Sequence, residues 1–190
     1  EYFALRNQAS LFDISPLHKY RIKGEEANLM LNRLLTRDVR KIKVGRVAYA
    51  IWCNQEGMLI DDGTLFRLND DNWRLCCQEP MLDWLLEAAW GYAVEITDES
   101  AEVAALSLQG PTSFSILSNA GFELDNTKPF DIYSDPTGVL ISRTGFTGDL
   151  GYEIWCPKEK ATQLWDLIWN SGSNWGLRAI GYDAVNIARV

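Results

Sequence analysis

The sequence contains few of the residues from which metal sites are built. It has one histidine, His18, and four cysteines, at positions 53, 76, 77 and 156, none of which forms a CxxC pair. A structural zinc site takes about four cysteine or histidine ligands at short, characteristic spacings. Cys76 and Cys77 are adjacent in a strand-like segment, so their side chains point to opposite faces. We therefore expect reduced thiols, no metal site and an intracellular protein.

The chain is also poor in basic residues and in long apolar runs. Lysine and arginine number 18 against 26 aspartates and glutamates, which gives a formal net charge of −8. Because nucleic-acid binding depends on a basic face, we expect no nucleic-acid partner. No stretch approaches the ~18 consecutive apolar residues of a membrane span, and no signal peptide begins the chain. These features predict no membrane partner and a cytoplasmic protein, or a mitochondrial matrix protein if the source is eukaryotic.

What the chain does contain is an internal repeat. Residues 19–35 and 105–120 each combine an alternating strand, a glycine turn and a helix with apolar residues at helical spacing. Residues 58–89 and 139–170 each contain strands followed by a helix. The order strand–helix–strand–strand–helix is used twice, which predicts an α+β fold with antiparallel or mixed sheets. Such a pair of sheets forms either plain packed layers or the walls of a central cavity.

The stretch SRTGFTGDLGYEIW (142–155) is the richest in chemistry. Glu153 stands between two large apolar residues in a predicted strand, so it lies either on a solvated face or in a pocket wall. A carboxylate in a strand can accept parallel N–H bonds from a flat aminopyrimidine-like edge. The three glycines of the stretch would let such a ring approach, and Phe146 and Tyr152 would cover its faces. No glycine-rich phosphate loop of either common type is present, which favours a pterin over a phosphate.

Two adjacent carboxylates, Asp61 and Asp62, occupy the corresponding place in the first repeat. Neighbouring strand residues face opposite sides, so only one of the two can face a cavity. The sequence Asp-Asp-Gly is also ordinary turn chemistry. Each acid is therefore either a turn cap or a partly buried carboxylate.

Five motifs together resemble the glycine-cleavage T-protein family of aminomethyltransferases. Residues 142–155 resemble its SRTGYTGEDGFEI signature, and the other four follow the family's order along the chain. Those four are LFDISPLHKYRIKG (11–24), NQEGMLIDDGTLF (54–66), LSLQGP (106–111) and GLRAIGYDAVNIARV (176–190). The resemblance covers nearly the whole chain.

The resemblance implies a fold and a cofactor. It implies that residues 1–190 form a tetrahydrofolate-binding region around a central cavity, with pseudo-repeats at about 11–98 and 99–190. It also implies a C-terminal β-barrel domain, which this sequence lacks. The expected activity is transfer of an aminomethyl or methyl group from a small donor to tetrahydrofolate.

The resemblance also implies roles for single residues. Glu153 matches the glutamate that binds the pterin, and Asp62 matches the aspartate beside the reacting folate nitrogens, as an electrostatic stabiliser or a general base. Tyr49 matches a cavity tyrosine, with Trp52 packed under a helix instead. Arg189 matches an arginine near the glutamyl tail.

Some positions depart from the family pattern and leave the donor open. Phe66 and Phe146 stand where the family often has tyrosines, Asp149-Leu150 replaces Glu-Asp, and Gly63-Thr64 replaces Leu-Ile. The donor is then glycine-derived, with a lipoyl carrier protein as partner, or a small methylated compound. The alternative is a non-catalytic folate-binding protein of the iron–sulfur-assembly type.

Overall fold

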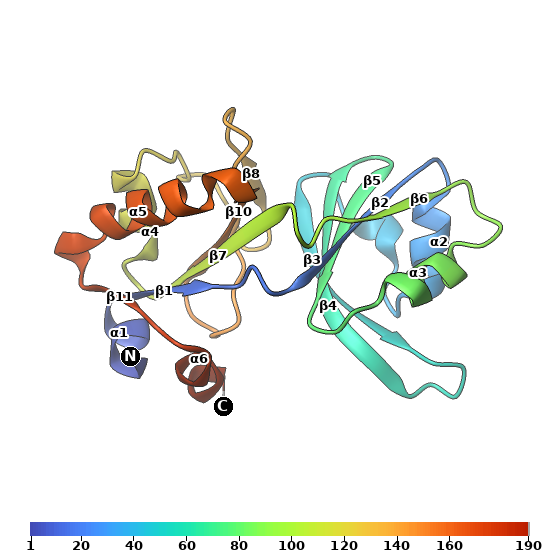
Figure 1. Cartoon of the computed structure of the whole chain (residues 1–190), viewed down its shortest axis with the longest axis horizontal. Helices are drawn as coiled ribbons and strands as arrows, with labels where there is room; N and C mark the ends of the chain where they lie inside the picture. Colours follow the sequence, from blue (N-terminus) through green and yellow to red (C-terminus); the bar gives the residue numbers. More distant parts are fainter. Residues whose placement is uncertain (190) are drawn as a thin grey trace. The chain divides into compact units, whose positions relative to one another are not determined.

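The computed structural model describes residues 1–189, which form two compact units (Figure 1). Unit 2 is continuous and comprises residues 16–101. Unit 1 comprises residues 1–15 together with the chain from residue 102 onward. Each unit has a sheet and a hydrophobic core of its own. No helix within the described residues is long and apolar enough to cross a membrane.

Unit 2 is a five-stranded sheet in the order β3-β4-β5-β2-β6, with every neighbouring pair antiparallel. Helices α2 and α3 lie on one face of this sheet (Figure 1). In chain order the elements of unit 2 are β2 (His18–Lys23), α2 (Ala27–Leu34), the 3-10 turn η1 (Val39–Lys41), β3 (Arg46–Cys53), β4 (Leu59–Asn69), β5 (Asn72–Cys77), α3 (Leu82–Ala88) and β6 (Glu95–Asp98).

The core of unit 2 forms because apolar residues recur at the period of each element. On α2, Ala27, Met30 and Leu31 are buried at helical spacing against the sheet. On β5, Trp73 and Leu75 alternate into the same core. The helix predicted within residues 19–35 is therefore confirmed, at Ala27–Leu34.

Unit 1 is a six-stranded sheet in the order β11-β1-β7-β10-β9-β8. Only the β1–β11 pair is parallel. The elements are α1 (Tyr2–Asn7), β1 (Ala9–Asp13), β7 (Val103–Gln109), α4 (Ser113–Asn119), β8 (Ile132–Ser134), β9 (Leu140–Ser142), β10 (Gly151–Pro157), η2 (Lys158–Lys160), α5 (Ala161–Ser171), η3 (Ser173–Trp175), β11 (Leu177–Ala179) and α6 (Tyr182–Arg189).

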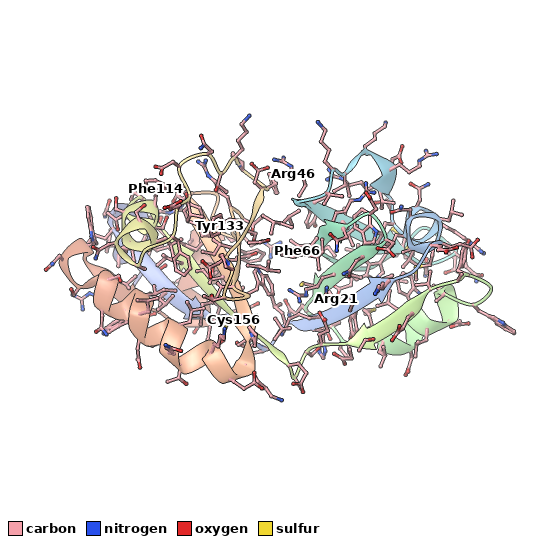
Figure 2. The ribbon with its side chains drawn as sticks, turned by 90° about the horizontal axis from the view of Figure 1, so that it is seen from above. Arg21, Arg46, Phe66, Phe114, Tyr133 and Cys156 are labelled. Atoms are coloured by element: carbon pink, nitrogen blue, oxygen red, sulfur yellow. The ribbon has the colours of Figure 1, made fainter. Side chains whose placement is uncertain are left out.

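Helices α4 and α5 cover one face of the unit 1 sheet. Ile116 and Leu117 of α4, with Leu164 and Ile168 of α5, are buried in the same core cluster as the strands. Phe114, also on α4, packs against this cluster (Figure 2). The opposite face of the sheet carries Glu153, which is described below.

The two units repeat one order of elements. In unit 2 the order is β2-α2-β3-β4-β5-α3-β6, and in unit 1 it is β7-α4-β8-β9-β10-α5-β11. The strand neighbours also correspond, except that β1 lies between β7 and β11 where β2 and β6 pair directly. The α+β class with duplicated units is thus confirmed. Each repeated order has two more strands than the predicted strand–helix–strand–strand–helix, and unit 1 adds β1.

The structure excludes one of the two alternatives for Asp61 and Asp62, the turn cap. Asp61, Asp62 and Gly63 do not form a turn, because all three lie inside strand β4. A Cβ atom on Gly63 would lie 2.1 Å from the carbonyl oxygen of Cys76 on β5. The glycine therefore marks a close approach of two strand backbones, a regular use of glycine within a sheet.

Candidate functional site

Glu153 projects from β10 on the face opposite the core of unit 1. Its neighbours Tyr152 and Ile154 are buried in that core, as the alternation of a strand requires. Its Cα partners on the flanking strands are Ser107 of β7 and Ser142 of β9, so hydroxyl side chains stand on both sides of it. Burial also raises the pKa of Tyr152. Tyr152 is therefore a core residue and does not cover a ligand ring, contrary to the expectation from the sequence.

The Glu153 carboxylate is half-buried and has no cationic partner within residues 1–189. The hydroxyl of Thr144 donates a hydrogen bond of 2.7 Å to its Oε2. Burial raises the pKa of Glu153 above its ordinary value, and the bond from Thr144 opposes this shift. The buried polar side chains described in unit 1 are all uncharged: Ser10, Ser107, Gln109, Ser113, Ser142, Thr144 and Thr147. The buried polar side chains of unit 1 therefore do not neutralise the charge of Glu153.

Gln109, at the end of β7, ties the loop before β10 to the sheet. Its side chain is 2% exposed. Its amide nitrogen donates to the carbonyl oxygens of Thr144 and Tyr152, at 3.3 Å each. Its amide oxygen accepts from the hydroxyl of Thr147 at 3.2 Å. The LQGP and SRTG motifs are thus physically joined through one amide.

Two of the glycines in the 142–155 stretch make room for this amide. A Cβ atom on Gly145 or Gly151 would lie 2.0 or 1.9 Å from the side-chain oxygen of Gln109. Gly148 instead has a φ of +76°, which glycine adopts without strain. From the sequence, the three glycines are expected to let a ligand ring approach. The structure explains them differently: two make room for the Gln109 side chain, and the third adopts a left-handed turn.

We expect Gly151→Ala to destabilise the protein by about 2 kcal/mol, because the added methyl overpacks a bonded, buried amide. Urea unfolding measures the change. In a Gln109→Ala background the same substitution should cost much less, since the space is then free. An equal cost in both backgrounds would contradict this account of the glycine.

Phe146 and Arg189 come together in unit 1. The guanidinium carbon of Arg189, in the last turn of α6, lies 4.4 Å from the centroid of the Phe146 ring, a cation–π distance. The Phe146 side chain remains 44% exposed. Two residues matched separately from the sequence are therefore direct neighbours.

Arg6 holds the same loop and was not recognised from the sequence. It donates to the carbonyl oxygen of Thr147 at 3.2 Å and to that of Ala188 at 2.5 Å, and it pairs with the Asp149 carboxylate. One side chain of α1 thus connects the loop with α6. No local pattern could have indicated these contacts, because their partners lie more than a hundred residues away in the sequence.

The other three matched residues share one face of the unit 2 sheet. Asp62 and Phe66 alternate with Thr64 on β4, and Tyr49 on β3 is the Cα partner of Thr64. The side chain of Phe66 is fully buried (Figure 2), whereas Tyr49 is 49% exposed and Asp62 is half-buried. This face is opposite to the one that α2 and α3 cover. The structure therefore groups Glu153, Phe146 and Arg189 in unit 1, and Asp62, Phe66 and Tyr49 in unit 2.

The same face of unit 2 carries two arginines that are already paired. Glu99 accepts from Nε of Arg21 at 2.8 Å and from Nε of Arg74 at 2.9 Å. Arg21 is seen on β2 in Figure 2. Because one carboxylate bridges both guanidinium groups, we assign these arginines to the structure and not to an anionic ligand.

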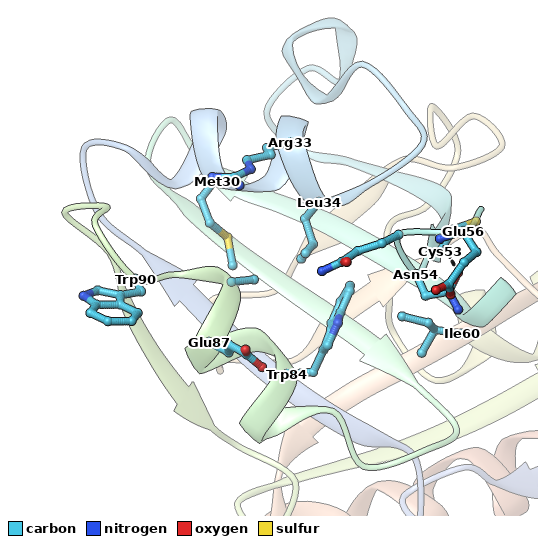
Figure 3. A pocket seen from close by; sticks show the side chains of 12 residues that line it. Met30, Arg33, Leu34, Cys53, Asn54, Glu56, Ile60, Trp84, Glu87 and Trp90 are labelled. Carbon is cyan, nitrogen blue, oxygen red and sulfur yellow. Dashed lines mark hydrogen bonds between the residues drawn. The ribbon is translucent and has the colours of Figure 1, made fainter. Parts of the chain in front are cut away.

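A cavity of about 670 Å³ lies elsewhere in unit 2, between α2, α3 and the β3–β4 hairpin (Figure 3). Met30 and Arg33 line it from α2, and Trp84 and Glu87 from α3. Trp84 stacks on the buried Trp52 with ring centroids 6.1 Å apart, which confirms that Trp52 packs under a helix. None of the matched site residues lines this cavity.

Comparison with known proteins decides the family. A family model described as the GCVT N-terminal domain matches residues 1–190. The chain belongs to this family. The aminomethyltransferase of Caldanaerobacter subterraneus subsp. tengcongensis is 34% identical over 198 residues, and that of Bacillus pumilus 35%.

The solved structures agree on the fold. Aminomethyltransferase T of the glycine cleavage system from Bartonella henselae superposes with a TM-score of 0.90 at 24% identity, over 99% of this chain and 52% of that one. A heterotetrameric sarcosine oxidase from Corynebacterium sp. U-96 superposes with a TM-score of 0.66 at 16% identity, over 91% and 88%. At these identities the likeness concerns the fold alone.

The GCVT N-terminal domain is one part of the longer relatives. The match covers 100% of this chain but 53% of the Caldanaerobacter relative and 54% of the Bacillus one. The chain therefore spans about half the length of the curated relatives it matches. The roles of the six matched residues stay predictions.

Proposed function

We propose that this protein is a tetrahydrofolate-dependent one-carbon transferase, which moves an aminomethyl or methyl group from a small donor to folate. Membership of the GCVT N-terminal domain family and relatives named aminomethyltransferase support the reaction class. The Glu153 carboxylate is the observation that supports folate as the ligand. It is half-buried, hydrogen-bonded through one oxygen to Thr144, and without a cationic partner among residues 1–189.

Glu153 fits the N–H edge of a pterin. The pterin ring of tetrahydrofolate presents an amino group and ring N–H groups along one side, and a carboxylate accepts parallel bonds from such an edge. Each hydrogen bond to a charged group contributes about 1.5–3 kcal/mol. Because the buried polar side chains of unit 1 are uncharged, the N–H groups of the ligand would meet the full charge of Glu153.

Arg189 is the proposed partner of the anionic glutamyl tail. A net charge of −8 opposes an anionic ligand, so a local cation is needed. The guanidinium of Arg189 lies over the Phe146 ring. Guanidinium N–H groups bind carboxylates in a fork geometry. Phe146, and in unit 2 Tyr49, are assigned aromatic contacts with the folate because their rings are exposed, whereas the fully buried Phe66 is not assigned one.

Asp62 is the proposed catalytic residue. Tetrahydrofolate supplies the nitrogen that accepts the one-carbon unit. Positive charge develops at the reacting centre, and a fixed carboxylate stabilises such charge. Asp62 is assigned this electrostatic role, with acceptance of the proton lost from the folate nitrogen as the alternative role for the same carboxylate.

The test begins with titration of tetrahydrofolate into the full-length protein by calorimetry. Transfer to tetrahydrofolate is then assayed from an aminomethylated lipoyl carrier protein, and from methylated amines, sulfonium compounds and aryl methyl ethers. Binding together with transfer from one donor supports the proposal and names the donor. No folate binding contradicts the proposal, and binding without transfer from any donor favours the non-catalytic alternative.

A further inference from the structure

A chain of hydrogen bonds runs through unit 1 and ends at Glu153. Nε1 of Trp155 lies 3.3 Å from Oγ of Ser142, and that oxygen lies 2.7 Å from Oγ1 of Thr144. Thr144 in turn lies 2.7 Å from Oε2 of Glu153. Trp155, Ser142 and Thr144 are 1%, 0% and 8% exposed, so water does not compete for these bonds.

The chemistry of Trp155 and Glu153, at the two ends of this hydrogen-bond chain, determines which group donates in each bond. An indole N–H only donates, and an ionised carboxylate only accepts. The Thr144 hydroxyl therefore donates to Glu153, the Ser142 hydroxyl donates to Thr144, and the Trp155 indole donates to Ser142. The other acceptor within reach of Ser142 is the carbonyl oxygen of Glu153, at the longer distance of 3.4 Å. Bonds aligned in this way polarise and strengthen one another.

This arrangement holds one carboxylate oxygen and leaves the other available. Oε2 of Glu153 accepts from Thr144, whereas Oε1 accepts no hydrogen bond from the described residues. A side chain held at one oxygen keeps its rotamer without ligand, so less conformational entropy is lost on binding.

We propose that Thr144, supported by Ser142 and Trp155, is a positioning residue that presents the Glu153 carboxylate to the N–H edge of its ligand. Folate as the ligand rests on the proposed function above. The hydrogen-bond chain itself rests only on the geometry of unit 1.

The side chains that flank Glu153 on the neighbouring strands and in the preceding loop of unit 1 are uncharged. The strands beside Glu153 present Ser107 and Ser142, and the preceding loop presents Thr144. Burial raises the pKa of Glu153, and the Thr144 bond opposes that shift. Removing the Thr144 hydroxyl should therefore raise the pKa of Glu153 further.

The first readout needs no ligand. The Glu153 carboxyl is titrated by ¹³C NMR in the full-length protein, with Glu153→Gln used to assign the signal. Thr144→Val should move its midpoint upward, whereas Thr144→Ser keeps a hydroxyl and should not. Thr147→Val removes another buried threonine hydroxyl of the same loop and serves as the matched control with an unchanged midpoint.

The second readout is the pH profile of tetrahydrofolate affinity. Near neutral pH, Thr144→Val should bind about tenfold more weakly than the wild type, because Glu153 is no longer held in place before binding and more conformational entropy is lost when the ligand fixes it. Its affinity should also begin to fall at a higher pH, since Glu153 becomes protonated earlier as the pH decreases. If Thr144→Val does not fold, Ser142→Ala should shift the midpoint in the same direction by a smaller amount.

The outcomes separate the two proposals. A midpoint that Thr144→Val leaves unchanged overturns the positioning role, whatever the protein binds. A midpoint that is shifted in Thr144→Val, in a protein whose wild type does not bind tetrahydrofolate, supports the positioning role and contradicts the proposed function. If Thr144→Val shifts the Glu153 midpoint and also shifts the pH profile of tetrahydrofolate affinity, the two results together support both proposals.

Discussion

Asp62→Asn is expected to lower the rate of one-carbon transfer by about 10²–10³-fold while tetrahydrofolate still binds. The substitution keeps the size and polarity of the side chain but removes its negative charge. Loss of one fixed group that stabilises developing charge typically has an effect of this order. Single-turnover transfer with a saturating donor measures the rate, and calorimetry measures the binding.

Asp61→Asn is the matched control for this experiment. Asp61 is the preceding residue on β4, and its carboxylate accepts from the backbone N–H groups of Asp62 at 2.8 Å and Glu79 at 3.3 Å. Because the Asp61 side chain binds backbone N–H groups, Asp61→Asn should transfer the one-carbon unit at nearly the wild-type rate. Equal losses in both variants would contradict a specific role of Asp62, and loss of folate binding in Asp62→Asn would make it a binding residue.

Glu153→Gln is expected to weaken tetrahydrofolate binding by about a hundredfold. The amide oxygen can still accept one N–H bond, but the amide nitrogen meets a second donor, so one bond is lost and the other loses its charge. Calorimetry on the full-length protein measures the affinity. Glu102→Gln, an exposed glutamate of the same unit that pairs with Lys158, should bind like the wild type. Unchanged binding in Glu153→Gln would remove the basis of the pterin assignment.

The same Glu153→Gln substitution should make the free protein more stable at neutral pH. Burial raises the pKa of Glu153 above the unfolded value. Between the two pKa values the folded chain binds more protons than the unfolded chain, so the free energy of unfolding decreases as pH rises through that window. Above the window the cost of the buried charge is fully present. Thermal unfolding at pH 7 should therefore show a higher Tm for Glu153→Gln, and a lower Tm would contradict the assignment.

The sequence predicts the regular parts of this structure because they depend on local periodicity. The helix within residues 19–35 and the α+β class follow from apolar spacing, and the structure confirms both. The alternation around Glu153 left a solvated face and a pocket wall equally open. The partial burial of Glu153 and its hydrogen bond from the buried Thr144 hydroxyl show that it is not on a solvated face.

The features that the sequence does not predict depend on contacts between distant residues. Gln109 explains Gly145 and Gly151 through a contact across more than thirty residues, and a glycine pattern alone cannot reveal what fills the space. Gly63 resembled a turn glycine because the approach of β5 is invisible in the sequence of β4. Arg6 binds a loop from which it is separated in the sequence by the whole of unit 2.

The position of β1 has a consequence for how the chain folds. β1 pairs with β7, and Asp13 lies opposite Leu106, yet all of unit 2 lies between these strands in the sequence. Closing that pair in an unfolded chain means ordering a loop of roughly 90 residues, at an entropic cost that grows with the logarithm of loop length. Once unit 2 has folded, its ends are already held and only short connections remain. Folding of the continuous unit should therefore precede completion of the sheet in the interrupted one, and slow steps should concentrate in the sheet that contains Glu153.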